Sequence, residues 1–159
     1  MIQAITESSF TAYINTEANR IDTSVDSSQI RYLVKFSNDL DGSVQYAYST
    51  IHLVYDRYTK LHFNYNATPD VYTGDTKLIP SGYYKYEVYE VSWTGAVAIS
   101  AGNAPVTEDD VLPIGSTHGV VQGLVAIGKL NMTDKSGTEQ VQYTQHTEPS
   151  GTNYIWYGQ

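Results

Sequence analysis

The chain has 159 residues and no cysteine, which excludes disulfides, thiolate metal sites and cysteine nucleophiles. Its length fits one domain over residues 1–159 that can bury a core without covalent crosslinks. The formal net charge of −8 argues against nucleic acid as a direct partner, because phosphate binding needs clustered Lys and Arg.

The start of the sequence gives no sign of export. It lacks a basic stretch followed by an apolar one, so we expect no secretory signal. The longest apolar run, residues 120–127, is interrupted by Gln122 and Gly123 and is too short to cross a bilayer. We therefore expect a protein that is made in the cytoplasm and has no membrane partner.

Apolar and polar residues alternate along much of the chain, which predicts β-strands. The clearest case is residues 30–48, where two alternating runs flank Asp41-Gly42, a dipeptide typical of hairpin turns. We therefore predict a β-hairpin over residues 30–48. The same alternation predicts further strands over residues 51–54 and 60–65.

Tyrosine accounts for 15 of the 159 residues and recurs in a predicted strand over residues 83–93. Apolar or aromatic residues occupy both faces of this strand, with Lys85 and Glu87 interrupting one of them. A strand that is covered on both faces usually lies in the interior of its sheet. We therefore predict that residues 83–93 form a central strand with protein packed above and below it.

The middle of the chain changes to a composition rich in Gly, Ala and Val. This composition predicts a long loop over residues 104–118, with one helical turn near Thr107. A loop of this length is more often functional or disordered than merely connective. A long strand is predicted over residues 120–132. Two more are predicted over residues 139–145 and 153–157.

The C-terminal stretch, residues 147–159, is unusually aromatic for a chain end, with Tyr154, Trp156 and Tyr157 close to the terminus. Leaving these rings in water would expose a sizeable apolar patch. Two arrangements would cover them. The stretch can pair with the chain's own sheet, or it can form an arm that adds a strand to a neighbouring subunit.

Strands at short intervals, with turn signals between them, predict an all-β fold. We expect an antiparallel β-sandwich of about seven to nine strands, immunoglobulin-like or jelly-roll-like. The long central loop and the C-terminal strand or arm belong to this fold.

Chemical motifs are weak throughout. Asn38–Gly42 resembles the start of a calcium loop but lacks the downstream glutamate, so a hairpin turn is favoured. The four histidines lack the spacing of a metal-binding pair, and the glycines fit no phosphate-binding pattern. Asp and Glu residues of the type used in glycoside hydrolysis are present, but nothing in the sequence fixes the distance between any two of them. We therefore predict a non-enzymatic protein without catalytic, cofactor-binding or metal-binding residues.

Three runs of sequence, residues 67–74, 80–91 and 136–143, resemble segments of small virion proteins of marine tailed bacteriophages. The resemblance spans residues 30–159 and lies in shared phrases without an active-site signature. It implies an accessory structural protein of the virion, made in the host cytoplasm, such as a capsid decoration protein or a neck or tail component. The implied partners are the major capsid protein, other virion proteins and further copies of the chain in a homo-oligomer.

Three elements carry more apolar residues than they can bury alone, and we predict that they contact partners: the 104–118 loop, the 83–93 strand and the 153–157 strand. The predicted contact residues are Tyr83, Tyr89, Trp93, His118, Tyr154, Trp156 and Tyr157. An alternative from another class is a carbohydrate-binding module for adsorption to a host surface. In that case, exposed aromatic rings would stack on sugars.

Overall fold

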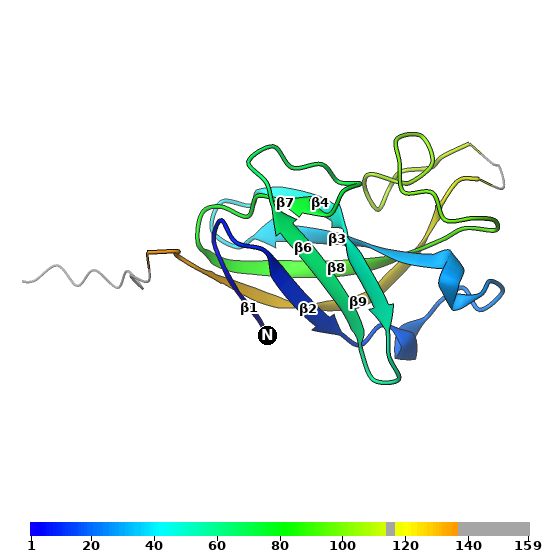
Figure 1. The fold of residues 1–159 in the computed structure, drawn as a ribbon, viewed down its shortest axis with the longest axis horizontal. Helices are drawn as coiled ribbons and strands as arrows, with labels where there is room; N and C mark the ends of the chain where they lie inside the picture. Colours follow the sequence, from blue (N-terminus) through cyan, green and yellow to red (C-terminus); the bar gives the residue numbers. More distant parts are fainter. Residues whose placement is uncertain (114–116, 137–159) are drawn as a thin grey trace, which may run out of the picture.

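A computed structural model describes residues 1–113 and 117–136 and shows a β-sandwich of two packed sheets (Figure 1). The predicted all-β sandwich is therefore confirmed. The larger sheet has five strands in the order β1-β9-β8-β3-β4. Their bounds are β1 Ile2–Ile5, β9 Val120–Thr133, β8 Gly82–Ser92, β3 Ile30–Asn38 and β4 Val44–Tyr48.

The smaller sheet has the strand order β2-β6-β5, and the short strand β7 pairs with β6 beyond the end of β5. Because β5 is the last strand in this order, its outer edge has no neighbouring strand among the described residues. The bounds are β2 Phe10–Ile14, β6 Thr59–Tyr65, β5 Ile51–Val54 and β7 Asp75–Thr76.

The two most specific strand predictions are confirmed. β3 and β4 form an antiparallel hairpin, and Gly42 in its turn has a φ of +72°, which glycine adopts without strain. β8 lies between β9 and β3, and side chains of both its faces belong to hydrophobic clusters. Strand β8 is thus central and covered on both sides.

Most strand pairs are antiparallel, as predicted, but β1 pairs in parallel with β9, and β6 in parallel with β7. β1 and β2 themselves were not foreseen, because our strand predictions began at residue 30. The apolar alternation of Phe10, Ala12 and Ile14 is the signal that marks β2, and all three side chains are buried. The strands predicted over residues 139–145 and 153–157 lie outside the described residues.

The helical turn predicted near Thr107 is a simple turn, in which the Asp110 N–H donates to the Thr107 carbonyl at 3.3 Å. Among the described residues, helical structure occurs instead as two 3-10 helices, η1 Glu17–Asn19 and η2 Ser27–Gln29. η2 begins with a capping box between Asp26 and Gln29. None of the helices in the described part of the chain is long and apolar enough to cross a membrane.

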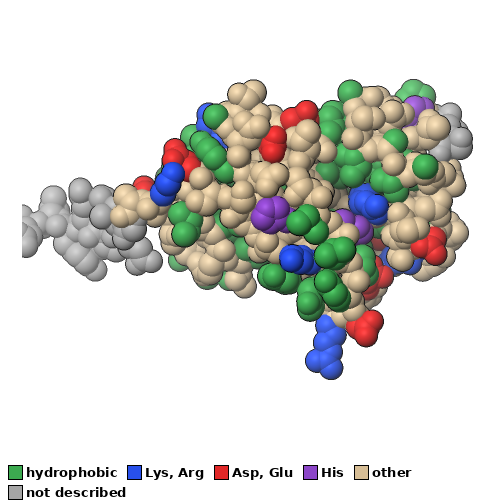
Figure 2. Space-filling view, viewed as in Figure 1, with side chains coloured by type: hydrophobic (Ala, Val, Ile, Leu, Met, Phe, Trp, Pro, Cys, Tyr) green, Lys and Arg blue, Asp and Glu red, His purple; other side chains and the backbone are tan. Residues whose placement is uncertain are grey.

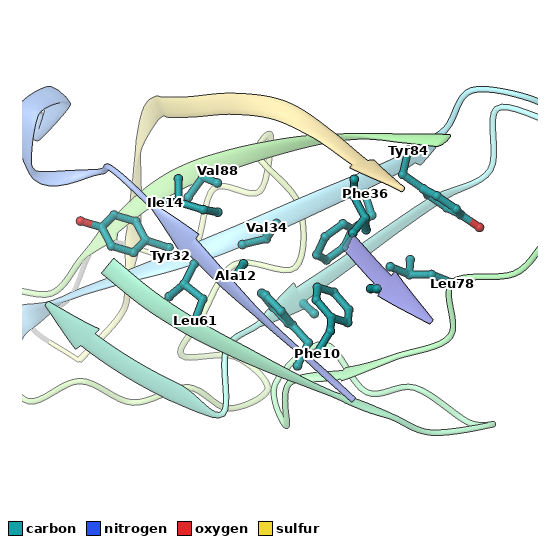
Figure 3. Close-up of a cluster of buried hydrophobic side chains, with 14 of the residues drawn as sticks. Phe10, Ala12, Ile14, Tyr32, Val34, Phe36, Leu61, Leu78, Tyr84 and Val88 are labelled. Atoms are coloured by element: carbon teal, nitrogen blue, oxygen red, sulfur yellow. The ribbon is translucent and has the colours of Figure 1, made fainter. Parts of the chain in front are cut away.

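The main hydrophobic core fills the space between the two sheets (Figure 3). Its aromatic centre joins Phe10 of β2 and Phe63 of β6 to Phe36 of β3, with ring centroids 5.3–6.0 Å apart. Such pairs add about 0.5–1.5 kcal/mol each beyond the burial of their area. These rings therefore hold one sheet against the other.

A second cluster covers the opposite face of the five-stranded sheet. Leu33, Tyr48 and Val91 of the sheet pack there with Trp93, which directly follows β8, and with Ala104. Ala104 belongs to the long connection between β8 and β9, of which residues 94–113 and 117–119 are described; we call these residues the cover segment. The predicted long loop thus lies over a sheet face and supplies part of a core.

Candidate functional site

The predicted contact residues differ in their exposure. Tyr83 on β8 is 55% exposed and can present its ring to a partner. Tyr89 packs partly buried against the second cluster. His118 is half-buried, and its Nδ1 has no hydrogen-bond partner among the described residues. Three others lie outside the described part of the chain: Tyr154, Trp156 and Tyr157.

Trp93 is fully buried beneath the cover segment. Gly119 lies so close to its ring that a Cβ on Gly119 would be 2.6 Å from Cζ2. The ring therefore packs the end of β8 against the cover segment, and in this conformation it has no surface to offer a partner. This burial could not be predicted from the sequence, because Gly119 covers the ring from the far end of a long loop.

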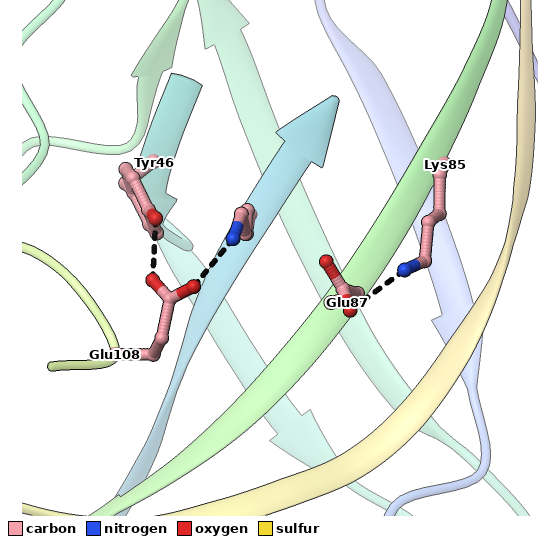
Figure 4. Close-up of polar contacts among 5 residues, drawn as sticks. Tyr46, Lys85, Glu87 and Glu108 are labelled. Carbon is pink, nitrogen blue, oxygen red and sulfur yellow. Dashed lines mark hydrogen bonds and ion pairs between the residues drawn. The ribbon is translucent and has the colours of Figure 1, made fainter. Parts of the chain in front are cut away.

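Glu108 attaches the cover segment to the five-stranded sheet (Figure 4). One carboxylate oxygen accepts a hydrogen bond from Lys35 of β3, and the other accepts one from the Tyr46 hydroxyl of β4. The Lys35 ammonium also lies 5.7 Å from the centroid of the Tyr46 ring, a cation–π distance. The buried Tyr48 hydroxyl donates to the Pro105 carbonyl at 2.8 Å and provides a second attachment.

The hydrogen bonds of this cluster shift its protonation equilibria. Burial, reinforced by the hydrogen bond to Glu108, raises the pKa of Tyr46 to about 12. Burial acts to raise the pKa of Glu108, but hydrogen bonds from Lys35 and Tyr46 outweigh it and lower that pKa. The hydrogen bond to Glu108 raises the pKa of Lys35. The ion pair therefore stays charged at neutral pH and serves to hold the cover segment.

A patch of exposed apolar side chains lies on the outer face of the smaller sheet, and we call it the β5 patch. Figure 2 shows hydrophobic side chains gathered there, next to the turn between β5 and β6. The exposed fractions of its members range from 39% to 59%. Its members are Tyr13, Ile51, Leu53, Tyr55 and Tyr58.

Strand register explains how the β5 patch forms. Tyr13 of β2 and Leu53 of β5 are both paired with Lys60 of β6, so the three side chains form one row across the sheet. Tyr58 continues the patch, with its ring centroid 5.4 Å from that of Tyr13 and 4.9 Å from that of Tyr55. The patch borders the outer edge of β5, which has no strand partner in the part of the chain that the structure describes and could receive another strand.

Sequence reasoning missed the β5 patch for a topological reason. Strand β5 was predicted, but β2 was not, and Tyr13 reaches Tyr58 only because β2 pairs with β6. Tyr55 and Tyr58 flank a turn and follow no period-two pattern. The sequence feature that could have revealed the patch is the apolar content of residues 51–55, which include a strand too short to lie at the centre of a sheet.

Two acidic residues of β8 have structural roles. Glu90 is fully buried on β8, and its two oxygens accept the backbone N–H groups of Ile21 at 3.0 Å and Asp22 at 2.7 Å. Glu87 accepts from Lys85 at 2.9 Å on the same strand (Figure 4). Among residues 1–113 and 117–136, no group of three or more His, Cys, Asp or Glu could hold a metal ion.

Compared with known proteins, the chain matches no protein-family model, no curated protein and no solved structure.

Proposed function

We propose that this protein is a non-enzymatic structural protein of a bacteriophage virion that binds the major capsid protein or further copies of itself. The β5 patch carries this proposal, because five exposed apolar side chains adjoin a strand edge that has no neighbouring strand among the described residues. Contiguous apolar surface of this kind marks protein–protein contact. The resemblance of the sequence to small virion proteins is the reason for proposing that these contacts are made in a virus particle.

The sandwich supports a contact role through its rigidity. Its cover segment is attached by Glu108 and by the Tyr48 hydroxyl, so both faces of the five-stranded sheet are packed. A packed sandwich with an apolar patch beside a strand edge suits repeated docking on a shell, where many weak contacts add up. A capsid decoration role fits this best, and a neck or tail position is the alternative within the same class.

The first test measures self-association. We expect the chain to form an oligomer in size-exclusion chromatography with light scattering, and Leu53→Lys or Tyr58→Lys to shift it toward the monomer. Leu40→Lys is the matched control, because Leu40 is 82% exposed in the β3–β4 turn, away from the patch. A trimer would favour decoration of a shell, and a large ring would favour the neck or tail.

The second test addresses the particle. Mass spectrometry of purified virions of the phage that encodes this sequence should detect the chain in many copies. Absence of the chain from purified virions would overturn the virion proposal. Equal incorporation of the wild type and the Leu53→Lys variant would overturn the role of the patch while leaving the virion assignment in place.

A further inference from the structure

An open groove of about 670 Å³ lies on the side of the sandwich where β2 faces β9. Its walls come from the end of β2 and the turn after it on one side, and from β9 on the other, with Tyr86 of β8 between them. This volume is in the range of ordinary small-molecule sites. The groove is separate from the side-chain cluster at Glu108.

The groove exists because β9 is longer than its outer neighbour. β1 pairs only with Leu130–Thr133, so the edge of β9 before Leu130 has no strand partner among the described residues. The Asn19 side chain donates to the Val125 carbonyl at 2.9 Å and occupies an edge acceptor that an added strand would need. This arrangement favours a ligand bound by side chains over an added β-strand.

Tyr86 brings a polar group to the groove. Its ring lies across Gly128 of the paired strand, where a Cβ would be 2.4 Å from the Tyr86 hydroxyl. Glycine at this position therefore gives the ring its space. Within the described part of the chain, the Tyr86 hydroxyl has no hydrogen-bond partner, and burial raises its pKa, so it is a neutral donor at physiological pH.

The other polar lining groups keep unused hydrogen-bonding capacity. Asn15 uses its Oδ1 to accept from Ala18, at 3.4 Å, and its amide N–H groups have no partner among the described residues. Asn19 donates through Nδ2 and keeps its Oδ1 as an acceptor. Arg20 donates through Nε to the Asp22 carbonyl and through Nη2 to a second carbonyl, which leaves Nη1 available. Amide, guanidinium and phenol groups thus converge on one space.

Apolar surface alternates with these polar groups. Tyr13, Leu124 and Ile127 line the groove and are 59%, 45% and 57% exposed. Sugar rings present hydroxyls that both donate and accept, together with apolar C–H faces that pack on aromatic and aliphatic side chains. We infer that this groove binds a neutral carbohydrate chain, with Tyr86, Asn15 and Asn19 bonding to hydroxyls and Tyr13 packing against a ring.

Charge favours a neutral ligand. Arg20 is the charged residue of the lining, and two of its nitrogen atoms already bond to backbone carbonyls. The chain as a whole carries a formal charge of −8, which repels acidic polysaccharides at long range. The groove and the β5 patch share Tyr13, whereas Leu53, Tyr55 and Tyr58 of the patch are not part of the groove lining.

The test is a glycan array carrying neutral and acidic oligosaccharides, followed by titration calorimetry with maltohexaose, cellohexaose, xylohexaose and N-acetylglucosamine hexamer. We expect binding of at least one neutral glycan and a 2- to 10-fold weaker affinity for Tyr86→Phe, which loses one hydrogen bond and keeps the ring over Gly128. Asn15→Ala should weaken the binding of the same glycan. Tyr83→Phe, on the same strand but outside the groove lining, is the matched control.

Three results would overturn the inference: no neutral glycan bound at millimolar concentration, only acidic glycans bound, or neutral glycans bound equally by wild type, Tyr86→Phe and Asn15→Ala. Circular dichroism of each variant verifies that it is folded. Leu53→Lys should retain glycan binding, because Leu53 is not part of the groove lining. Loss of self-association and loss of glycan binding are thereby separate outcomes.

Discussion

Acid should destabilise the sandwich through His52, whose ring points from β5 toward the core. The ring meets Tyr32 edge-on with 5.2 Å between centroids, and its buried Nε2 has no hydrogen-bond partner in the described part of the chain. Burial, with a smaller effect from the positive charge of Arg31, lowers the pKa of His52 from 6.5 to about 4. The folded protein therefore keeps this imidazole neutral.

The sign and size of the effect follow from this difference. The unfolded chain takes up a proton on His52 near pH 6.5, whereas the folded chain takes it up only near pH 4, so acid favours unfolding. This contribution is fully present above about pH 6.5 and is lost as the pH falls toward 4. Between pH 7.5 and pH 4.5 the free energy of unfolding should fall by about 2.5 kcal/mol through this residue.

The assay is urea unfolding followed by tryptophan fluorescence at several pH values between 4.5 and 7.5. His52→Gln cannot take up the proton, so its free energy of unfolding should decline less than that of the wild type over this window, by about 2.5 kcal/mol. His62→Gln is the matched control. His62 lies on β6 next to Leu61, the residue paired with His52, and its ring forms a hydrogen bond with Thr11. Parallel pH curves for wild type and His52→Gln would refute the reasoning.

Three substitutions test other parts of the structure. Glu90→Gln places an amide NH₂ against a backbone N–H and should lower the free energy of unfolding by about 1–3 kcal/mol in urea titrations; an unchanged midpoint would contradict this. Gly119→Ala forces a methyl group against the Trp93 ring and should cost about 1–3 kcal/mol, with altered tryptophan fluorescence. Glu108→Ala should speed hydrogen exchange in the cover segment without changing exchange in β2 or β6, because it releases Lys35 and Tyr46.

The parts of the fold that depend on local sequence could be predicted. The hairpin of β3 and β4 follows from an Asp-Gly turn between alternating runs, and the central place of β8 follows from its two apolar faces. The N-terminal strands could not be placed in the same way. β1 is four residues long and takes its position from a parallel partner at the far end of the described chain.

The candidate contact residues were harder to predict, because aromatic content does not reveal which side of a strand is covered. Trp93 and Tyr89 are predicted from the sequence as contact residues, yet the cover segment folds back over the face of the sheet on which they lie. Tyr13 and Tyr58 were not chosen, yet they meet on an open face because β2 pairs with β6. Exposure at these positions is a property of strand order, which alternation along one strand does not encode.

The pairing of β1 with β9 has a consequence for how the protein is made. Ile2 lies opposite Leu130, so β1 is synthesised well before β9, the strand with which it pairs. Contacts between such distant parts of a chain form slowly and leave strand edges unpaired in the meantime. During synthesis the edge of β1 therefore stays unpaired until β9 has been made, and the five-stranded sheet can be completed only after translation has passed Thr133.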